Sequence, residues 1–213
     1  MNLKRRLPQY IAGLILMAVG VVLIKRAALG ISPLSAIPDA VANITPFTLG
    51  NMTIAFHALC VLMQIIVEKR VTLKTVLTLP LAVAFGYVID LFMLLIALPS
   101  DSLWLRAAAC FGGIVVTGLG IVMIVGADLM LPAPDAFLRA VSATYSQPLS
   151  RVKTVGDVVW VVLTIAIDLI FSGRIISVGI GTVFSALLTG KFVGWWNSLL
   201  PGLKMEPTSK ASK

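Results

Sequence analysis

Charged residues and metal-binding side chains are scarce in this 213-residue chain. Only 12% of its residues are charged, and it has one histidine and two cysteines. Cys60 and Cys110 both fall inside long apolar stretches, so no disulfide framework or zinc site is expected, and buried packing is the predicted role of each. No metal-ligand spacing, phosphate-binding loop or nucleophile elbow occurs in the sequence. We therefore expect neither an enzyme nor a bound cofactor.

Apolar residues, in contrast, are abundant. They make up 59% of the chain, and the mean hydropathy is +1.02, far above what a water-soluble surface can carry. Stretches close to the roughly 20 apolar residues that cross about 30 Å of hydrocarbon occur six times. We predict an all-α membrane protein in which residues 1–213 form one membrane domain. Its six transmembrane helices are expected at about 9–29, 48–67, 76–98, 106–127, 154–171 and 175–199.

The basic residues that give the net charge of +8 lie scattered at the ends of the predicted spans. They lack the clustering that phosphate binding uses, so no nucleic-acid partner is expected. If the N-terminus is cytoplasmic, Arg106 and Arg174 lie in outer loops and most other basic residues lie inside, as the positive-inside rule requires. We predict that both termini are cytoplasmic, with a disordered tail at 201–213. The residues placed inside are Lys4, Arg5, Arg6, Lys69, Arg70, Lys74, Arg139, Arg151, Lys153, Lys204, Lys210 and Lys213.

The two halves of the chain share a repeated pattern at an offset of 100 residues. AALGISPLSAIPDAV at 27–41 corresponds to ADLMLPAPDAFLRAV at 127–141, and Gly13 and Gly20 correspond to Gly113 and Gly120. Further on, TLGN at 48–51 matches TVGD at 154–157, and TLPLAVAFG at 78–86 matches TVFSALLTG at 182–190. Because three spans separate equivalent points, the second copy is predicted to be inverted in the membrane, as in many secondary transporters. The repeats are expected at 9–98 and 106–200.

In each repeat, about 15–20 residues between the first two spans are too interrupted to cross the membrane. Pro33 and Pro134 suit the first turn of a short helix, because proline supplies the required φ and lacks an N–H. We predict half-helices at about 33–43 and 134–144 that enter from opposite faces, with N-termini that favour an anionic or zwitterionic solute. The alternative is a pair of amphipathic helices on the membrane surface. Thr48 and Thr154 are the predicted N-caps of the following helices.

Ionisable side chains within the predicted spans are candidates for function, because each costs about 3 kcal/mol to place there. The helical rise places Arg26 near Asp90 in the outer part of the first repeat, and Asp128 near Lys191 in the inner part of the second. We predict two ion pairs, Arg26–Asp90 and Asp128–Lys191, that hold the fold. Contact with a substrate or a gate is the alternative role of these four side chains.

Other polar side chains complete the predicted site. His57 lies mid-span, where it either couples proton movement or serves as a hydrogen-bonded packing residue. Asn51 and Asp157 occupy matching places near helix starts, where capping is sufficient to explain them and ligand contact is the alternative. The predicted substrate-binding residues are Arg26, Ser35, Asn51, His57, Asp135, Asp157 and Lys191; no catalytic or metal-binding residue is predicted.

Three motifs carry a resemblance to a known family: KRAALGISPLSA at 25–36, SRVKTVGDVVWVVL at 150–163 and SVGIGTVFSALLTGKFV at 177–193. On these the chain resembles the YczE/YyaS/YitT-type family of bacterial membrane proteins, over nearly all of residues 8–200. The resemblance implies a small six-span protein of the bacterial inner membrane. It also implies a basic position at Arg26 and an acidic position at Asp157. Ser35 stands where an aspartate is expected, and Gly194 stands where the first repeat has Asp90.

Together these patterns predict a small secondary transporter or facilitator for a small solute, with anionic and zwitterionic molecules as first candidates. Arg26 would contact the anionic group, and the acids would contact cations or protons. Two alternatives remain: a substrate-capturing subunit of a multi-chain, ATP-driven vitamin importer, and a non-transporting assembly or sensory protein. The expected surroundings are the lipid bilayer, and a homodimer is compatible with so small a chain.

Overall fold

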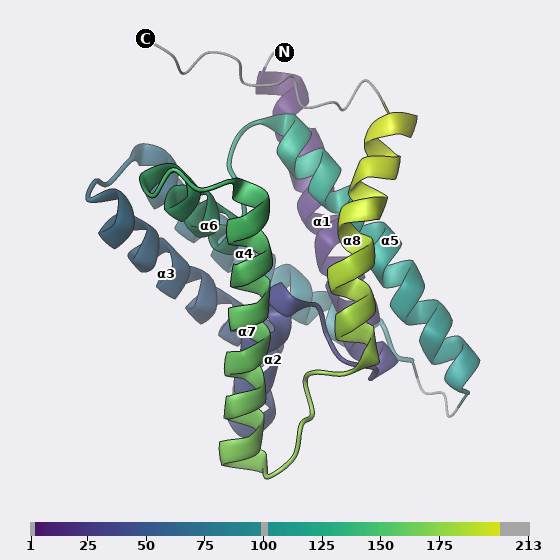
Figure 1. Cartoon of the computed structure of the whole chain (residues 1–213). Coiled ribbons are helices and arrows are strands. Elements are labelled where there is room, and N and C mark those ends of the chain that lie inside the picture. Colours follow the sequence, from purple (N-terminus) through teal and green to yellow (C-terminus); the bar gives the residue numbers. More distant parts are fainter. Residues whose placement is uncertain (1–2, 99–101, 201–213) are drawn as a thin grey trace.

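The computed structural model describes residues 3–98 and 102–200, and every regular element in these two ranges is a helix. The eight helices are arranged as shown in Figure 1. Five of them, α1, α3, α4, α5 and α7, are long and apolar enough to cross a membrane, so the chain is a multi-pass helical membrane protein. The helices are α1 (Leu3–Ala27), α2 (Pro33–Ile44), α3 (Leu49–Glu68), α4 (Leu73–Leu95), α5 (Leu103–Ala127), α6 (Ala133–Thr144), α7 (Leu149–Ser172) and α8 (Ile180–Leu199).

The sixth predicted span, at 175–199, corresponds to α8, which is 20 residues long. It is not among the helices with the apolar character of a span, and its C-terminal half contains Lys191 and Asn197. The predicted tail at 201–213 lies outside the described residues.

The two short helices are confirmed where the prolines predict them. α2 begins at Pro33 and α6 at Ala133, one residue before Pro134. The predicted cap of α3 is also confirmed, since the Thr48 hydroxyl accepts a hydrogen bond from the Asn51 N–H at 3.1 Å. The predicted cap at Thr154 is wrong. α7 begins five residues earlier, at Leu149 after Pro148, so Thr154 lies within the helix and donates to the Ser150 carbonyl.

α1 and α5 pack against each other in antiparallel directions, with glycines at their close contacts. A Cβ on Gly13 would lie 2.9 Å from the carbonyl oxygen of Gly120, and a Cβ on Gly20 would lie 2.7 Å from that of Gly113. Small residues at these positions let the two backbones touch, as in other membrane helix pairs. α4 packs on the α1 side of this pair and α8 on the α5 side.

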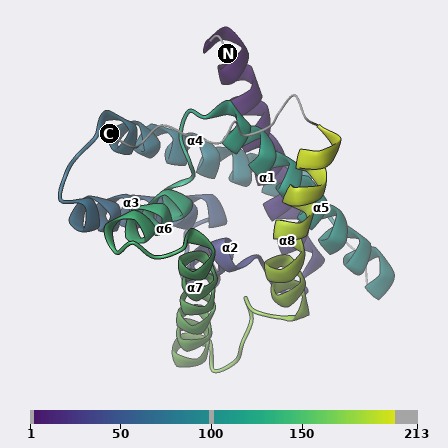
Figure 2. The same ribbon diagram turned by 45° about the horizontal axis from the view of Figure 1, so that its top comes forward.

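The remaining helices, α2, α3, α6 and α7, form a closed ring of neighbours beside the α1–α5 pair. α2 and α6 each contact both α3 and α7, and α3 also packs against α4 (Figure 2). Apolar side chains fill the middle of this four-helix ring. Among them, Phe56 of α3 meets Trp160 of α7 edge to face at 5.3 Å, next to Cys60 and Ala133. The ring thus brings both short helices against spans from both halves of the chain.

Candidate functional site

A charged cluster lies where α6 begins against α7. Asp135 is in the first turn of α6, where the partial positive charge of the helix N-terminus favours a carboxylate. Its Oδ1 lies 2.5 Å from Nζ of Lys153 on α7. The two side chains are only 26% and 44% exposed, respectively, so the pair is partly withdrawn from solvent.

Asp157 lies four residues after Lys153 and therefore on the same face of α7. Its Oδ1 is buried and has no hydrogen-bond partner among the described residues. We call Asp135, Lys153 and Asp157 the Asp135 cluster. With one lysine and two aspartates, the cluster has one negative charge in excess when all three are ionised. Because a buried polar atom without a partner costs about 1–3 kcal/mol, Asp157 is poised to accept a proton, a cation or a hydrogen bond.

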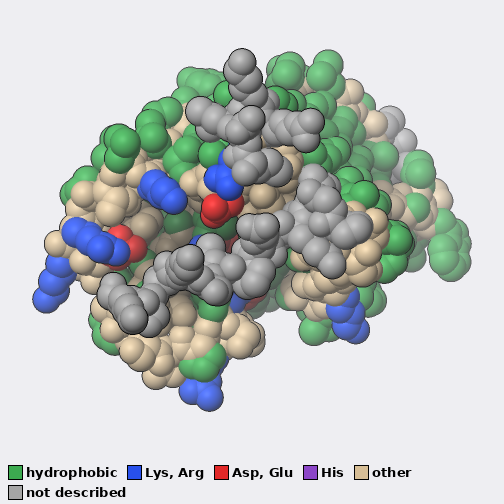
Figure 3. Space-filling model, turned by 90° about the horizontal axis from the view of Figure 1, so that it is seen from above, with side chains coloured by type: hydrophobic (Ala, Val, Ile, Leu, Met, Phe, Trp, Pro, Cys, Tyr) green, Lys and Arg blue, Asp and Glu red, His purple; other side chains and the backbone are tan. Residues whose placement is uncertain are grey.

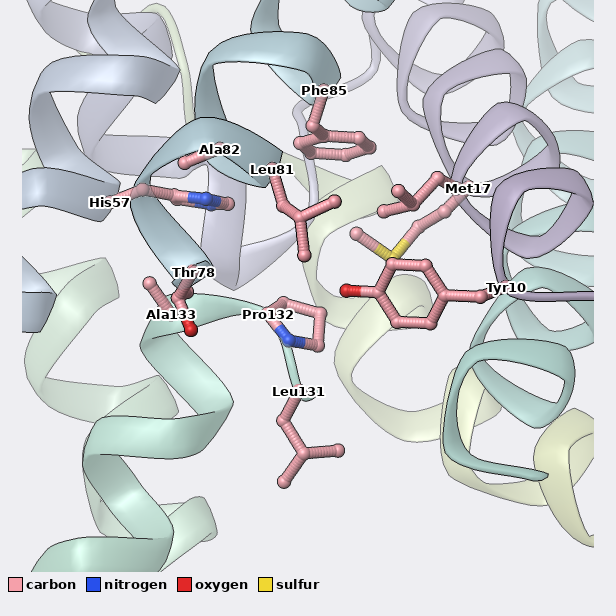
Figure 4. A pocket seen from close by; sticks show the side chains of 11 residues that line it. Tyr10, Met17, His57, Thr78, Leu81, Ala82, Phe85, Leu131, Pro132 and Ala133 are labelled. Carbon is pink, nitrogen blue, oxygen red and sulfur yellow. The ribbon is translucent and has the colours of Figure 1, made fainter. Parts of the chain in front are cut away.

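His57 of α3 lies close enough for Asp135 to act on it electrostatically. Its ring stacks on Phe85 of α4, with 5.8 Å between the ring centroids and 14° between their planes. His57 also lines a small pocket between α1, α3, α4 and the segment joining α5 to α6 (Figure 4). The structure thus brings three of the predicted site residues, His57, Asp135 and Asp157, to one region of the ring.

Sequence reasoning missed Lys153 as a site residue and placed it with the cytoplasmic basic residues. The early start of α7 puts it on the helix instead, one turn before Asp157. The spacing of four residues between a lysine and an aspartate was the available signal.

The predicted Arg26–Asp90 ion pair is wrong. Arg26 donates to the Met93 carbonyl, near the C-terminal end of α4. Asp90 instead accepts hydrogen bonds from the Thr48 hydroxyl at 2.6 Å and the Gly50 N–H at 2.8 Å, at the start of α3. Each charge therefore lies at a helix end of opposite polarity. The Asp90 carboxylate contacts the N-terminus of α3, and the Arg26 guanidinium contacts a carbonyl near the C-terminus of α4.

The predicted Asp128–Lys191 pair is also wrong. Asp128 ends α5 with a left-handed backbone and lies 3.7 Å from Arg6 of α1. Lys191 is exposed on α8. Two other predicted site residues also have local partners: Ser35 accepts from Ser32 at the start of α2, and Asn51 donates its N–H to Thr48. No hydrogen bond or ion pair in the described ranges joins Arg26, Ser35, Asn51 or Lys191 to the Asp135 cluster.

A second polar cluster, which sequence reasoning did not predict, surrounds Asp39 of α2. Asp39 is 2% exposed, and its Oδ1 lies 2.6 Å from Nζ of Lys25 on α1. Asn43, one turn further along α2, accepts from Lys25 at 3.1 Å and donates to both Asp39 and the hydroxyl of Ser177, at 3.3 and 3.1 Å. These bonds join α1, α2 and the loop before α8.

Asp168 of α7 anchors the same loop. It is fully buried, and its Oδ2 accepts from the N–H groups of Ile176 and Ser177, both at 2.8 Å. The loop in turn pairs with the segment between α1 and α2: Ile31 donates to the Ser177 carbonyl, and Gly181 donates to the Leu29 carbonyl at 2.7 Å. These bonds therefore join α1, α2, α7 and the loop before α8. The residues that make them, here called the Asp39 cluster, are Lys25, Asp39, Asn43, Asp168 and Ser177.

Comparison with known proteins gives a family but no activity. A model of one family matches residues 4–198. The chain belongs to DUF6198, a family of unknown function. No curated protein and no solved structure gives a significant match. The chemistry of this DUF6198 protein therefore has to be argued from its two polar clusters.

The two clusters lie at opposite ends of α7. Asp157 and Asp168 are 11 residues apart on that helix, which corresponds to about 16 Å along its axis. Each cluster holds an ammonium group and a buried carboxylate oxygen without a hydrogen-bond partner within the described part of the chain, Asp168 Oδ1 in one and Asp157 Oδ1 in the other. They differ in access: Asp39 and Asp168 are buried and bound to neighbouring helices and loop backbone, whereas Asp135 and Lys153 are partly exposed. Charged side chains of both signs also gather on the face seen from the end where α1 begins, and hydrophobic side chains cover the flanks (Figure 3).

Proposed function

We propose that this protein is a small secondary transporter or facilitator for a small zwitterionic or anionic solute in the bacterial inner membrane. The observation that carries the proposal is the Asp135 cluster, a partly buried group of charges where the short helix α6 begins against α7. Lys153 would bind a carboxylate or another anionic group, and Asp157 would bind an amine or a proton. In many transporters the ends of such broken helices form the substrate site.

The packing of the helices supports two inverted three-helix repeats with α8 as the sixth span. At an offset of 100 residues, the contact of Gly13 with Gly120 becomes a contact of Gly113 with Gly20, which is also present. Likewise, the contacts of α2 with α3 and α7 have counterparts in those of α6 with α7 and α3. Contacts that recur when the two halves are swapped are expected if a pseudo-two-fold axis in the membrane plane relates the halves.

The proposed orientation places both termini in the cytoplasm. The Asp39 cluster then seals the outer end of the ring, and the Asp135 cluster lies toward the cytoplasm. A solute would reach Lys153 and Asp157 from inside in this arrangement. The outer seal, made by the loop that Asp168 anchors, would have to open for release to the other side.

The test is uptake into proteoliposomes of a labelled panel of amino acids, mono- and dicarboxylates and amines. We expect at least one panel compound to accumulate above protein-free vesicles, and Lys153→Met to reduce its uptake at least tenfold, which corresponds to about 1.4 kcal/mol of lost binding. Lys191→Met, on the exposed side of α8, is the matched control and should retain uptake.

Two outcomes would contradict the proposal. One is uptake no greater than that of empty vesicles across the whole panel. The other is equal loss in Lys153→Met and Lys191→Met. Copurification of ATPase subunits with a protein that binds but does not transport would favour the importer-subunit alternative.

A further inference from the structure

The pocket beside His57 contains polar groups that the protein itself does not satisfy. Tyr10 of α1 is 2% exposed and His57 of α3 is 7% exposed, and neither side chain has a hydrogen-bond partner in the described parts of the chain. Figure 4 shows the Tyr10 hydroxyl and the His57 ring directed toward the same space. Thr78 of α4 also lines this space; its hydroxyl donates to the Lys74 carbonyl, so its oxygen remains free to accept.

The rest of the pocket wall is apolar, and the space has room for about one water molecule. Leu81 and Phe85 of α4 close it on one side, and Pro132, just before α6, closes it on another. Buried waters in proteins typically make about three hydrogen bonds to groups that otherwise lack partners. Tyr10, His57 and Thr78, from three different helices, provide that number.

We propose that this pocket binds one water molecule and that the water and His57 together form the proton-binding site of the transport cycle. The inference rests on the proposed transport function. A hydronium ion in the pocket would pass its proton to the unprotonated ring nitrogen of His57: an N–H bond forms, an O–H bond breaks, and a neutral water remains. Tyr10 would orient that water by hydrogen bonding.

The groups around His57 show how the proton would be coupled to the solute. The side chains that α4 places along the pocket do not titrate; they are Thr78, Leu81, Ala82 and Phe85. The titratable groups are Tyr10 on α1, Cys60 on α3 and Asp135 on α6. Asp135 is the charged group among them, and its carboxylate is shared with Lys153. An imidazolium at His57 would attract that carboxylate and loosen its hold on Lys153. Proton binding would thereby release the ammonium group for the anionic end of a solute.

His57 is the only histidine, so nitrogen NMR of histidine-labelled protein in lipid nanodiscs reports this ring alone. We expect the imidazolium signal to appear as the pH is lowered from 9 to 4. At a given acidic pH its fraction should fall at least twofold in Asp135→Asn, because the compensating charge is gone. Tyr10→Phe should move the unprotonated ring nitrogen away from its hydrogen-bonded shift, and Lys191→Met should change neither signal.

A ring that stays neutral down to the lowest pH at which the protein remains folded would overturn the inference, as would equal imidazolium fractions in wild type and Asp135→Asn. The uptake panel separates this failure from that of the proposed function. The proton site is refuted if an imposed pH gradient does not stimulate uptake, or if it still stimulates uptake in His57→Gln. Either result is compatible with the proposed transporter. Absence of uptake from the whole panel, with the NMR linkage present, refutes the transporter and leaves the water and His57 as a proton-binding site with no role in transport.

Discussion

The third long helix of each half packs differently. In the first half, α4 lies directly against α3: a Cβ on Gly50 would come within 2.2 Å of the Gly86 carbonyl oxygen, and Asp90 caps the start of α3. In the second half, the residues that correspond to Gly86 and Asp90 are Gly190 and Gly194, and a Cβ on either would meet no atom within 4 Å. α7 and α8 lie apart in both ribbon views (Figures 1 and 2).

This difference shows that one repeated pattern supports two arrangements. The closed arrangement has a carboxylate, Asp90, that bonds across the interface, whereas the open one has Gly194 in its place and a loop fixed by Asp168. In the proposed transporter, the third long helix of each half, α4 or α8, can either pack against the second long helix of that half or lie apart from it. Exchange of these positions would open the outer end and close the inner one.

The largest effect should come from filling the closed interface. Gly50→Val would force a side chain into the Gly86 backbone, and we expect a loss of about 3 kcal/mol or more in unfolding free energy. Gly190→Val, at the corresponding open position, should change stability by less than about 0.5 kcal/mol. Thermal or detergent-induced unfolding of both variants measures the contrast. Equal destabilisation would mean that α7 and α8 are closed in the membrane.

The next effect concerns the anchor of the open half. Asp168→Ala removes the acceptor of two backbone N–H groups at a fully buried position, so we expect a loss of about 2–3 kcal/mol. Asp128→Asn is the control, because asparagine tolerates the left-handed backbone at this position. Its side chain is 63% exposed and its ion pair with Arg6 spans 3.7 Å, so the change should stay within about 0.5 kcal/mol. Unfolding measurements that rank the two variants in the opposite order would refute the anchoring role.

A smaller effect should follow from loss of the cap in the closed half. Asp90→Ala leaves the Gly50 N–H without its acceptor, and we expect about 1 kcal/mol of destabilisation. Asp90→Asn should recover part of this, because the amide oxygen still accepts a hydrogen bond. Unchanged stability in Asp90→Ala would show that the glycine contact alone holds α3 to α4.

The sequence predicted the positions of the helices better than the interaction partners of the charged side chains. Proline positions located α2 and α6 to within a residue, and the apolar runs located the long helices. The helical rise gives the depth of a side chain but not the face that its helix turns to each neighbour, so Asp90 was assigned to Arg26 rather than to α3. α7 was predicted to start too late, which hid Lys153.

The two buried acids, Asp39 and Asp168, could not be predicted for a related reason. Asp168 is stabilised by loop N–H groups eight and nine residues away, and Asn43, which binds Asp39, reaches Ser177 134 residues further along the chain. Only the folded arrangement of the α7–α8 loop creates these partners. Three candidate site residues named from the sequence lie in one region of the fold. His57 stood out as the lone histidine within a predicted span, Asp135 as an acid at the start of a predicted half-helix, and Asp157 as the counterpart of Asn51 near a helix start.

The proposed transport cycle depends most on the exchange of the two arrangements between the halves. It is tested by distances between spin labels on exposed positions, Leu59 with Tyr87 for α3 and α4 and Val158 with Leu187 for α7 and α8, in nanodiscs at pH 5 and pH 8. We predict that a change of pH shifts the two distance distributions in opposite directions, with α7 approaching α8 as α4 leaves α3. Distributions that stay the same at both pH values, or that shift together, would contradict it.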